Sequence, residues 1–243
     1  MTGPNRSTAV MQRRAATAPD ALDYFPTPPW ATRALCHWLI NLGEPLHDQR
    51  VWEPACGEGF MARPLTEYFD QVRATDVYRY GEEHGICDFL DTDSCADWAP
   101  VDWIITNPPF KAAEAFIHHG RRIARQGIAM LVRSAFTESA GRCESLFGGP
   151  DLPSWELQFA ERVVMLKGRL IRAGAPDPFN LDDDGQPTRA SSATSYTWLV
   201  WMPGQHDWRK RIIAPCRLNL ECKGDYPAYP EQWALIRPDG GLL

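Results

Sequence analysis

The sequence predicts one α/β domain with a mostly parallel central sheet and helices on both faces. Segments with strand character alternate with segments of helical periodicity, which is the order typical of strand–helix–strand units. The strand segments, such as residues 128–136, are apolar almost throughout, as expected of parallel strands that are buried on both faces. The chain has 243 residues, of which 44% are hydrophobic, and this length and composition suit one domain with a sizeable core.

The expected elements follow one another along the chain. Residues 28–43 carry apolar residues at helical spacing, begin with prolines and end with a glycine, so they predict a helix. A strand beginning at residue 50 runs into a glycine-containing loop that ends at residue 59. The later segments predict, in order, a helix at 60–70, a strand at 72–77, a strand with its exit loop at 102–110, a helix at 111–127, and strands at 128–136, 161–169 and 194–202.

Three regions of the chain differ in composition. Residues 1–20 carry arginines and lack the apolar core of a signal peptide, so we interpret them as a flexible leader, with a transit peptide as the alternative. Residues 21–215 form the expected main domain, which includes a polar loop at 170–194, and loops of that length are usually functional or disordered. Residues 216–243 are expected to pack on the same domain as a tail.

The composition argues against several classes of protein. The formal net charge is −6, which does not suit a generally basic, polyanion-coating protein. No apolar run approaches the length of a membrane span, so no membrane is expected as a partner. The seven cysteines include no CxxC pair and the six histidines show no metal spacing. We therefore expect neither a disulfide framework nor a metal site, and a cytoplasmic location.

Three segments fall where strands end, which is where open parallel sheets bind ligands. The glycine loop, Glu53 to Gly59, permits a sharp turn, and its leading acid suits an amino group better than a phosphate; a plain strand-to-helix turn is the alternative. Asp76 closes the second strand, where an acid accepts hydrogen bonds from ribose hydroxyls or simply caps a turn. Asp88 and Phe89 follow as a pair that could bond and cover an adenine ring, or form an ordinary turn with a core phenylalanine.

A fourth segment, Asn107-Pro108-Pro109-Phe110, points to a more specific chemistry. An exocyclic amino group is a poor nucleophile because its lone pair is delocalised into the ring. Two fixed acceptors, the side-chain oxygen of Asn107 and the carbonyl of Pro108, can draw its hydrogens out of the ring plane and free that lone pair. The prolines fix the backbone, and Phe110 offers a face on which a planar group can stack. A proline-terminated strand explains the prolines but not the whole combination.

In this order, the glycine loop, Asp76, Asp88-Phe89-Leu90 and Asn107-Pro108-Pro109-Phe110 resemble the gamma group of S-adenosylmethionine-dependent DNA adenine-N6 methyltransferases. The stretch Asp23-Tyr24-Phe25-Pro26-Thr27-Pro28-Pro29 resembles the element that precedes the glycine loop in that group and closes over the methionine end of the cofactor. The resemblance covers residues 23–136 in detail. It implies a Rossmann-like methyltransferase fold, with 21–215 as the catalytic domain.

The resemblance also implies a role for each matching residue. Glu53, Ala55, Gly57 and Gly59 would bound the methionine part of S-adenosylmethionine, with Phe25 and Thr27 covering it, Asp76 on the ribose, Asp88 and Phe89 at the adenine of the cofactor, and Asn107 next to it. Asn107, Pro108, Pro109 and Phe110 would hold a target adenine flipped out of double-stranded DNA. Transfer would be a direct in-line displacement, so no metal is required and Cys56 is interpreted as packing rather than as a nucleophile.

The compact chain resembles phage- or prophage-borne DNA methyltransferases, which implies a bacterial or infected-host cytoplasm. Recognition would then fall to the loop at 170–194 and to the tail. DNA binding needs cations that neutralise phosphates, and the candidates are Lys111, Arg121, Arg122, Arg125, Arg133, Arg169, Arg209, Lys210 and Arg211. Each of them is also an ordinary solvated side chain when taken alone, and the acids Asp182 to Asp184 oppose the assignment.

Three alternatives stay open at this point. An RNA amino-methyltransferase would use the same pocket chemistry. A protein-glutamine N5 methyltransferase also uses this motif, because a side-chain amide presents the same two hydrogens, but only about fifty residues precede the glycine loop here, where those enzymes usually carry a helical domain. A non-catalytic binding module is the third alternative. The recognition sequence and the oligomeric state do not follow from the residues.

Overall fold

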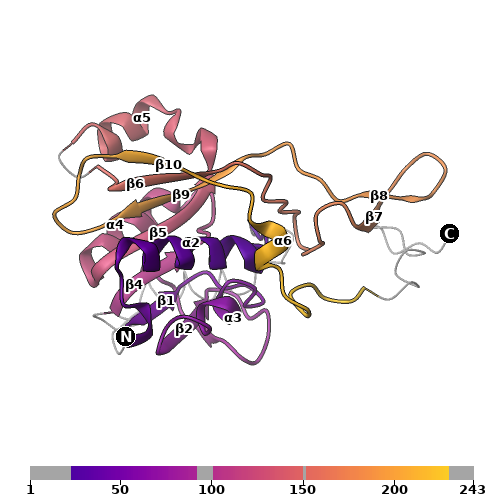
Figure 1. Cartoon of the computed structure of the whole chain (residues 1–243), viewed down its shortest axis with the longest axis horizontal. Helices are drawn as coiled ribbons and strands as arrows, with labels where there is room; N and C mark the ends of the chain where they lie inside the picture. The colour runs from indigo at the N-terminus through magenta and orange to yellow at the C-terminus, as the bar shows by residue number, and fades with distance from the viewer. Residues whose placement is uncertain (1–22, 92–100, 150–151, 230–243) are drawn as a thin grey trace, which may run out of the picture.

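The computed structural model describes residues 23–91, 101–149 and 152–229. Within these residues, eight strands form one sheet in the order β10-β6-β9-β5-β4-β1-β2-β3 (Figure 1). The strands are β1 (Arg50–Glu53), β2 (Gln71–Asp76), β3 (Gly85–Ile86), β4 (Val101–Thr106), β5 (Ala124–Arg133), β6 (Trp155–Phe159), β9 (Tyr196–Trp201) and β10 (Arg209–Ile213). Only β9 runs antiparallel to its neighbours, β5 and β6, so the sheet is mostly parallel, as predicted.

Helices cover both faces of this sheet. Alternate residues of β4 divide between two cores, because successive side chains of a strand point to opposite faces. Trp103 and Ile105 pack in the cluster that contains α2 (Pro29–Leu42) and part of the segment around α3 (Ala62–Leu65). Ile104 packs in the cluster that contains α4 (Ala113–Ile123). The three-layer arrangement that the apolar strand runs predicted is therefore confirmed.

The helix predicted at 28–43 is α2. Pro29 occupies its first turn, where a missing N–H costs nothing, and Gly43 ends it with φ of 104° while its N–H donates to the carbonyl of Ile40. The remaining short helical elements are η2 (Leu46–Asp48), η4 (Ser134–Thr137), α5 (Ala140–Arg142), η5 (Cys143–Phe147) and α6 (Arg217–Leu220).

Two predicted helices are shorter than expected. The segment 60–70 contains only the four residues of α3, flanked by turns, and Pro64 lies within it and cannot donate a backbone hydrogen bond. The helix predicted at 111–127 ends at Ile123, and residues 124–127 open β5. There the pairing with β4 outweighs the helical pattern, because β4 and β5 pair from Val101 opposite Ala124 onward.

The strand predicted at 161–169 is wrong. This segment instead passes beside the carboxyl end of β4, with Gly168 at φ of 71° and its N–H donating to the Tyr24 carbonyl at 2.9 Å. The sheet position next to β9 belongs to β6, which pairs antiparallel with β9 and parallel with β10. Val163, Val164 and Met165 are buried all the same, so their apolar character reflects packing and not strand pairing.

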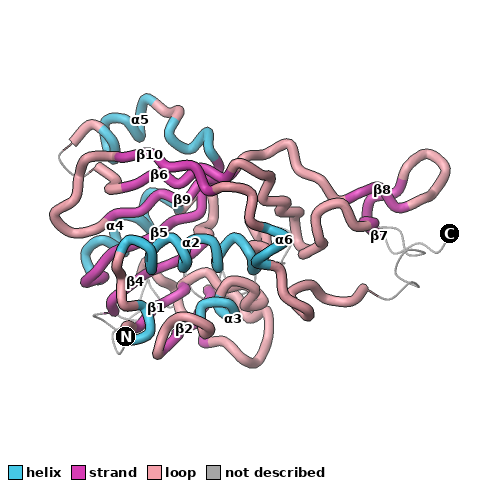
Figure 2. Tube along the Cα trace, in the orientation of Figure 1, coloured by secondary structure: helices cyan, strands magenta, loops and turns pink. Residues whose placement is uncertain are grey.

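The long loop predicted at 170–194 contains a hairpin of β7 (Pro176–Leu181) and β8 (Pro187–Arg189). Figure 2 shows these two strands projecting from the body of the domain. Residues Arg209 to Arg211, for which the sequence predicted no strand, lie in the edge strand β10.

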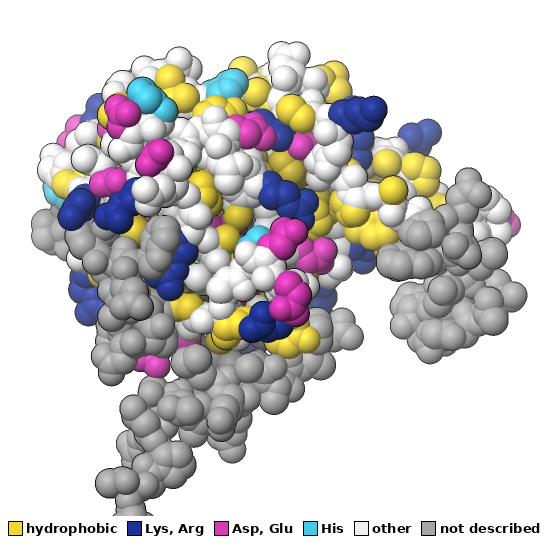
Figure 3. All heavy atoms as spheres, turned by 90° about the horizontal axis from the view of Figure 1, so that it is seen from below, with side chains coloured by type: hydrophobic (Ala, Val, Ile, Leu, Met, Phe, Trp, Pro, Cys, Tyr) yellow, Lys and Arg dark blue, Asp and Glu magenta, His cyan; other side chains and the backbone are white. Residues whose placement is uncertain are grey.

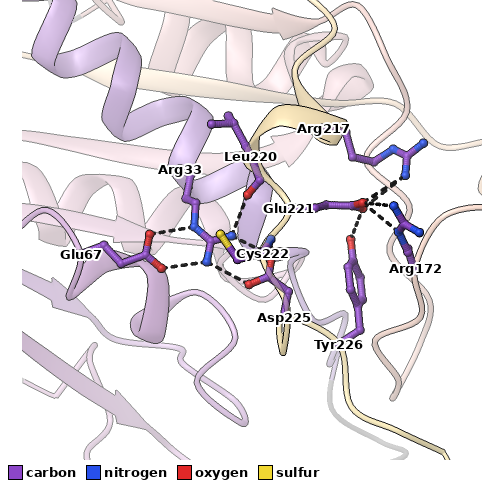
Figure 4. A network of polar contacts seen from close by, with 9 residues as sticks. All are labelled: Arg33, Glu67, Arg172, Arg217, Leu220, Glu221, Cys222, Asp225 and Tyr226. Atoms are coloured by element: carbon purple, nitrogen blue, oxygen red, sulfur yellow. Dashed lines mark hydrogen bonds and ion pairs between the residues drawn. The ribbon is translucent and has the colours of Figure 1, made fainter.

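Residues 217–226 are held to the domain by two buried or half-buried ionic clusters (Figure 4). Arg33 of α2 makes paired hydrogen bonds to Glu67, at 2.7 and 2.8 Å, and to Asp225, at 2.7 and 2.9 Å. In the second cluster Glu221 accepts from Arg172, Arg217 and Tyr226. Arg33 and Asp225 are almost fully buried, so their charges depend on one another for solvation.

Parts of the sequence predictions fall outside the described residues. These are the leader at 1–20 and the end of the tail from 230. In the described part of the chain, no helix is long and apolar enough to cross a membrane. Five described cysteines are free, whereas Cys87 is disulfide-bonded, a bond that the cysteine spacing did not predict.

Replacing Arg33 tests whether this cluster holds the tail. Arg33→Ala leaves the Asp225 carboxylate buried without its partner, and we expect the free energy of unfolding to fall by about 3–5 kcal/mol in denaturant titrations. Asp225→Asn in the same background should recover part of the loss. Arg79→Ala, which removes an exposed pair with Glu82, serves as the control and should leave the unfolding midpoint unchanged. An Arg33→Ala protein as stable as the wild type would show that the tail is anchored elsewhere.

Candidate active site

A cavity of about 320 Å³ opens at the carboxyl ends of β1, β2 and β4. Glu53 is the last residue of β1, Asp76 is the last residue of β2, and Asn107 directly follows β4. Because these strands are parallel and adjacent, their ends meet at one edge of the sheet. The cavity is lined by Asp23, Tyr24, Phe25, Pro26, Thr27, Glu53, Pro54, Ala55, Cys56, Phe60, Met61, Asp76, Val77, Tyr80, Cys87, Asp88, Phe89, Leu90, Asn107, Pro109, Lys111, Ala112 and Phe116.

The glycine loop closes one wall of the cavity. Gly57 and Gly59 have φ of 54° and 80°, a region that side chains other than glycine rarely adopt. A Cβ on Gly57 would collide with the Tyr24 ring, and one on Gly59 would lie 2.5 Å from Nε2 of His84. The N–H of Gly57 donates to the Asp76 carboxylate at 2.9 Å, which fastens the loop to the end of β2.

Two carboxyl groups face each other across this loop in a buried setting. Glu53 is 2% exposed, and within the described residues its Oε2 has no hydrogen-bond partner. Burial raises the pKa of Glu53 well above its ordinary value, and the charge of Asp76 raises it further. Burial also raises the pKa of Asp76. The backbone N–H groups of Tyr78 and Gly57, which bond its carboxylate, lower this pKa but do not outweigh burial. The Ala62 backbone N–H bonds this Glu53 carboxyl and lowers its pKa, but a buried carboxyl with one oxygen left unpartnered in a cavity wall is a feature expected of a site for a cationic group.

The Asn107 side chain is fixed by its amide nitrogen. Nδ2 donates to the carbonyl of Phe25 at 2.9 Å and to the hydroxyl of Thr27 at 3.2 Å, and Sδ of Met165 lies 3.7 Å away. These contacts set the amide orientation, and Oδ1 remains the acceptor that no described donor occupies. The Pro109 carbonyl accepts from the N–H of Ala112, whereas no described backbone N–H bonds the Pro108 carbonyl. Adjacent residues therefore keep two acceptors, Asn107 Oδ1 and the Pro108 oxygen, that no described hydrogen bond occupies.

A second feature, which we call the aromatic slot, shares Phe25 with the wall of the cavity. We define the slot by Phe25, Phe110 and Arg133. The two rings have centroids 5.1 Å apart at an interplanar angle of 44°. The guanidinium carbon of Arg133 lies 3.9 Å from the Phe110 centroid and 5.9 Å from that of Phe25. Phe110 is half-buried and is not among the residues that line the cavity.

Of the other residues predicted for the cofactor, Ala55, Asp88 and Phe89 line the cavity, whereas Gly57 and Gly59 shape the glycine loop and are not among the lining residues. Asp88 is buried and accepts from the N–H of Leu90 at 3.1 Å, and Ala55 lies at the start of the glycine loop. Phe89 is 2% exposed and packs edge-on against Trp52, at a centroid distance of 5.2 Å. It is a core residue that presents part of its surface to the cavity.

Tyr24, Tyr80 and Met165 are among the site residues that were not predicted from the sequence. The Tyr24 ring lies 4.5 Å from that of Tyr80, and its hydroxyl contacts Glu58 of the glycine loop. Tyr24 stands beside Phe25 in the quoted N-terminal stretch, so its position was a usable signal. Tyr80 and Met165 had none, because Tyr80 follows β2 in an irregular segment and Met165 comes from the mispredicted strand at 161–169.

The predicted nucleic-acid contacts separate into two groups. Lys111, Arg133 and Arg169 lie on the carboxyl side of the sheet, although Arg169 is paired with Asp177 at 2.6 Å. The others are Arg121, Arg122 and Arg125 at the turn from α4 into β5, and Arg209, Lys210 and Arg211 at the beginning of β10. Since β5 and β10 run parallel to β4, these side chains belong to the opposite edge or the outer strand. On the face shown in Figure 3, basic and acidic side chains are interspersed.

Comparison with solved structures agrees with the fold described above. No family model and no curated protein sequence matches the chain. The chain has a Rossmann-like α/β fold, which is similar to that of a proposed RNA methyltransferase from Pyrococcus horikoshii, with a TM-score of 0.52 at 13% identity over 83% of this chain and 98% of that one. A modification subunit of a proposed type I restriction enzyme from Vibrio vulnificus also matches, with a TM-score of 0.47 at 14% identity over 98% of this chain, which spans only 54% of that subunit.

The state of Glu53 predicts how stability depends on pH. A carboxyl whose pKa is raised by folding favours the folded state below its unfolded pKa and loses that contribution as the pH rises. Glu53→Gln, which stays neutral, should therefore gain stability over the wild type as the pH rises above 4.5, because only the wild type has to ionise a buried carboxyl. Denaturant titrations from pH 5 to pH 8 measure this, with Glu82→Gln, an exposed glutamate, as the control. A difference that does not change with pH would contradict the assignment.

Proposed function

We propose that the protein is an S-adenosylmethionine-dependent methyltransferase that methylates the N6 amino group of an adenine flipped out of double-stranded DNA. The observation that carries the proposal is the orientation of Asn107. Its nitrogen is bound by Phe25 and Thr27, so its oxygen and the neighbouring Pro108 carbonyl form a pair of acceptors beside the cavity. A site built this way accepts two hydrogens from one planar nitrogen.

The acceptor pair supplies the chemistry that an amino group needs. Both hydrogens of the amino group would be held, one by Asn107 Oδ1 and one by the Pro108 oxygen, so the nitrogen lone pair is drawn away from the ring. The acceptors are positioned before the substrate arrives, because Asn107 is bonded and the prolines restrict the backbone. Among the described residues, none of the groups that bond Asn107 is a general base, which suits direct displacement, since the proton can leave after transfer.

The cavity residues fit the cofactor. S-adenosylmethionine, when bound, supplies an electrophilic methyl group on a sulfonium centre. Glu53 would accept the amino group of its methionine part, which gives the unpartnered Oε2 a bond and favours the ionised carboxylate. Asp76 has backbone N–H bonds to both oxygens and would use its remaining lone pairs for ribose hydroxyls. Asp88 would accept from the adenine of the cofactor.

The slot of Phe25, Phe110 and Arg133 suits an aromatic acceptor. Stacking of a base on an aromatic side chain contributes about 1–3 kcal/mol. The contact of an exposed guanidinium with a ring contributes about 0.5–1 kcal/mol. A base can therefore displace Arg133 from the face of the Phe110 ring. The side-chain amide of glutamine has no ring to stack, so the comparison of these energies favours a nucleobase as the substrate.

The choice of DNA over RNA rests on the sequence resemblance, and the assay must separate them. Lys111 and Arg133 are the exposed cations nearest the slot, and no described carboxylate pairs with either. They suit the phosphates that flank a flipped nucleotide of either polymer. RNA is the second candidate, since it offers the same amino groups and the structurally similar protein from Pyrococcus horikoshii is described as acting on RNA.

Labelled methyl transfer tests the proposal directly. Duplex DNA, ribosomal RNA and a release-factor-type protein are offered in parallel, and the products are digested to nucleosides or amino acids. We expect N6-methyladenine from DNA. Asn107→Ala should lower turnover by about 10²–10³-fold, because the acceptor for the amino group is lost. Asn219→Ala, at an exposed amide of α6, is the control. Label recovered from RNA or from glutamine would support the chemistry proposed for the pocket but would show that DNA is not the substrate.

Cofactor affinity should depend on pH through Glu53. At low pH the carboxyl is protonated and must lose its proton to pair with an ammonium group, so affinity should rise between pH 5 and pH 7, by up to about tenfold per unit for one proton. Calorimetry with S-adenosylmethionine measures this rise. 5′-Methylthioadenosine, which lacks the amino acid part, should show no such rise, and Glu53→Gln should abolish it. If the affinities of S-adenosylmethionine and 5′-methylthioadenosine depended on pH in the same way, Glu53 would not be the residue that binds the amino group.

A further inference from the structure

The stacking face of Phe110 is covered in the free protein. The guanidinium carbon of Arg133 lies 3.9 Å from the ring centroid, which is the separation expected of two stacked planar groups. Phe25 packs against the same ring from the side, at a centroid distance of 5.1 Å. The guanidinium thus occupies the place where the proposed function puts the plane of a target base.

No ion pair holds Arg133 in this position. It is the last residue of β5, its side chain is exposed, and among the described residues no carboxylate pairs with it. Its anchor is a hydrogen bond to the buried hydroxyl of Tyr196, at the start of β9; burial raises the pKa of that hydroxyl, and the charge and hydrogen bond of Arg133 lower it. The guanidinium can therefore leave the ring without breaking a salt bridge.

We propose that Arg133 is a specificity-determining residue that reserves the acceptor slot for aromatic bases by occupying the Phe110 face until a base displaces it. This inference rests on the proposed function. An entering group has to replace the guanidinium contact with a stronger one before it reaches Asn107. A nucleobase does so because it has an extended π face, whereas a side-chain amide gains nothing from the ring and leaves Arg133 in place.

Displacement also changes where the charge lies. Once the base is on Phe110, the Arg133 guanidinium stands at the mouth of the slot, on the carboxyl side of the sheet together with Lys111. Two cations at that position can contact phosphates on either side of the inserted nucleotide. The same residue then excludes small neutral amides from the slot and favours an anionic chain over a neutral one.

Ligand binding to the full-length protein tests this inference. The cofactor cavity is first saturated with S-adenosylhomocysteine, and adenosine and N-acetylglutamine amide are then titrated into the wild type and Arg133→Ala by calorimetry. We expect adenosine to bind about two- to fivefold more tightly to Arg133→Ala, because the competing contact is gone. The amide should not bind the wild type. Arg142→Ala, which removes a guanidinium 4.4 Å from the Phe136 ring outside the slot, is the matched control and should bind adenosine like the wild type.

A second readout uses the wild type alone. In protein labelled with ¹³C and ¹⁵N arginine, the Arg133 side-chain resonances, assigned by their loss in Arg133→Ala, should be shifted upfield by the Phe110 ring. Adenosine should return them to ordinary positions, whether or not S-adenosylhomocysteine binds. Unshifted resonances, resonances that adenosine does not move, or weaker adenosine binding to Arg133→Ala would each overturn the inference. Absence of S-adenosylhomocysteine binding would instead overturn the proposed function, so the two failures are distinguishable.

Discussion

The site depends on the hydrogen bonds that the Asn107 amide nitrogen donates to the N-terminal segment. Residues 23–27 have no regular structure of their own, and the bonds to Phe25 and Thr27 join them to the end of β4. The segment then covers two features at once: Tyr24 rests on the glycine loop, and Phe25 packs on Phe110. Without this connection the cavity would lose one wall and the amide would be free to rotate. One side chain therefore sets both the shape of the cavity and the direction of its acceptor.

The parallel sheet brings the polar residues of the site together without any further structural element. Glu53, Asp76 and Asn107 are far apart in sequence, yet each directly ends or follows a strand, so sheet pairing alone brings them to one edge. The same topology buries the carboxyl groups, because strands on both sides exclude water. Burial at this position raises the pKa of Glu53, so the ionised carboxylate destabilises the folded state. We therefore expect the protein to be more stable with a neutral residue at this position than with the acid that the sequence has. A buried acid that lowers the stability of the fold is typical of a binding site.

The sequence predicted those parts of the fold and site that local patterns determine. The helix at 28–43, the strand ends and the glycine loop follow from periodicity, proline and glycine, and all of them lie within a few residues of their predicted positions. The strand at 161–169 failed because Val163 to Met165 are as apolar as a strand but are buried against the site. β6 was missed because its Trp-Glu-Leu-Gln-Phe alternates with partly exposed polar residues, a weaker pattern than that of a buried parallel strand. The sequence could not show which of the predicted nucleic-acid contacts lie near the cavity, because only the sheet topology determines the edge of the sheet at which each basic side chain lies.

The hairpin of β7 and β8 shows how charge limits the ways in which a duplex could lie over the slot. Its base is tied to the domain by Arg169 with Asp177 and by Arg172 with Glu221, so the arm is carried on the same body as the cavity. Its turn, however, holds Asp182, Asp183 and Asp184, all exposed, and three carboxylates repel a phosphate backbone. Basic side chains near the slot come instead from Lys111 and Arg133. Under the proposed function, a bound polyanion would be drawn toward Lys111 and Arg133 and repelled by the tip of the arm, so the base of the hairpin would be the part of the arm able to approach it.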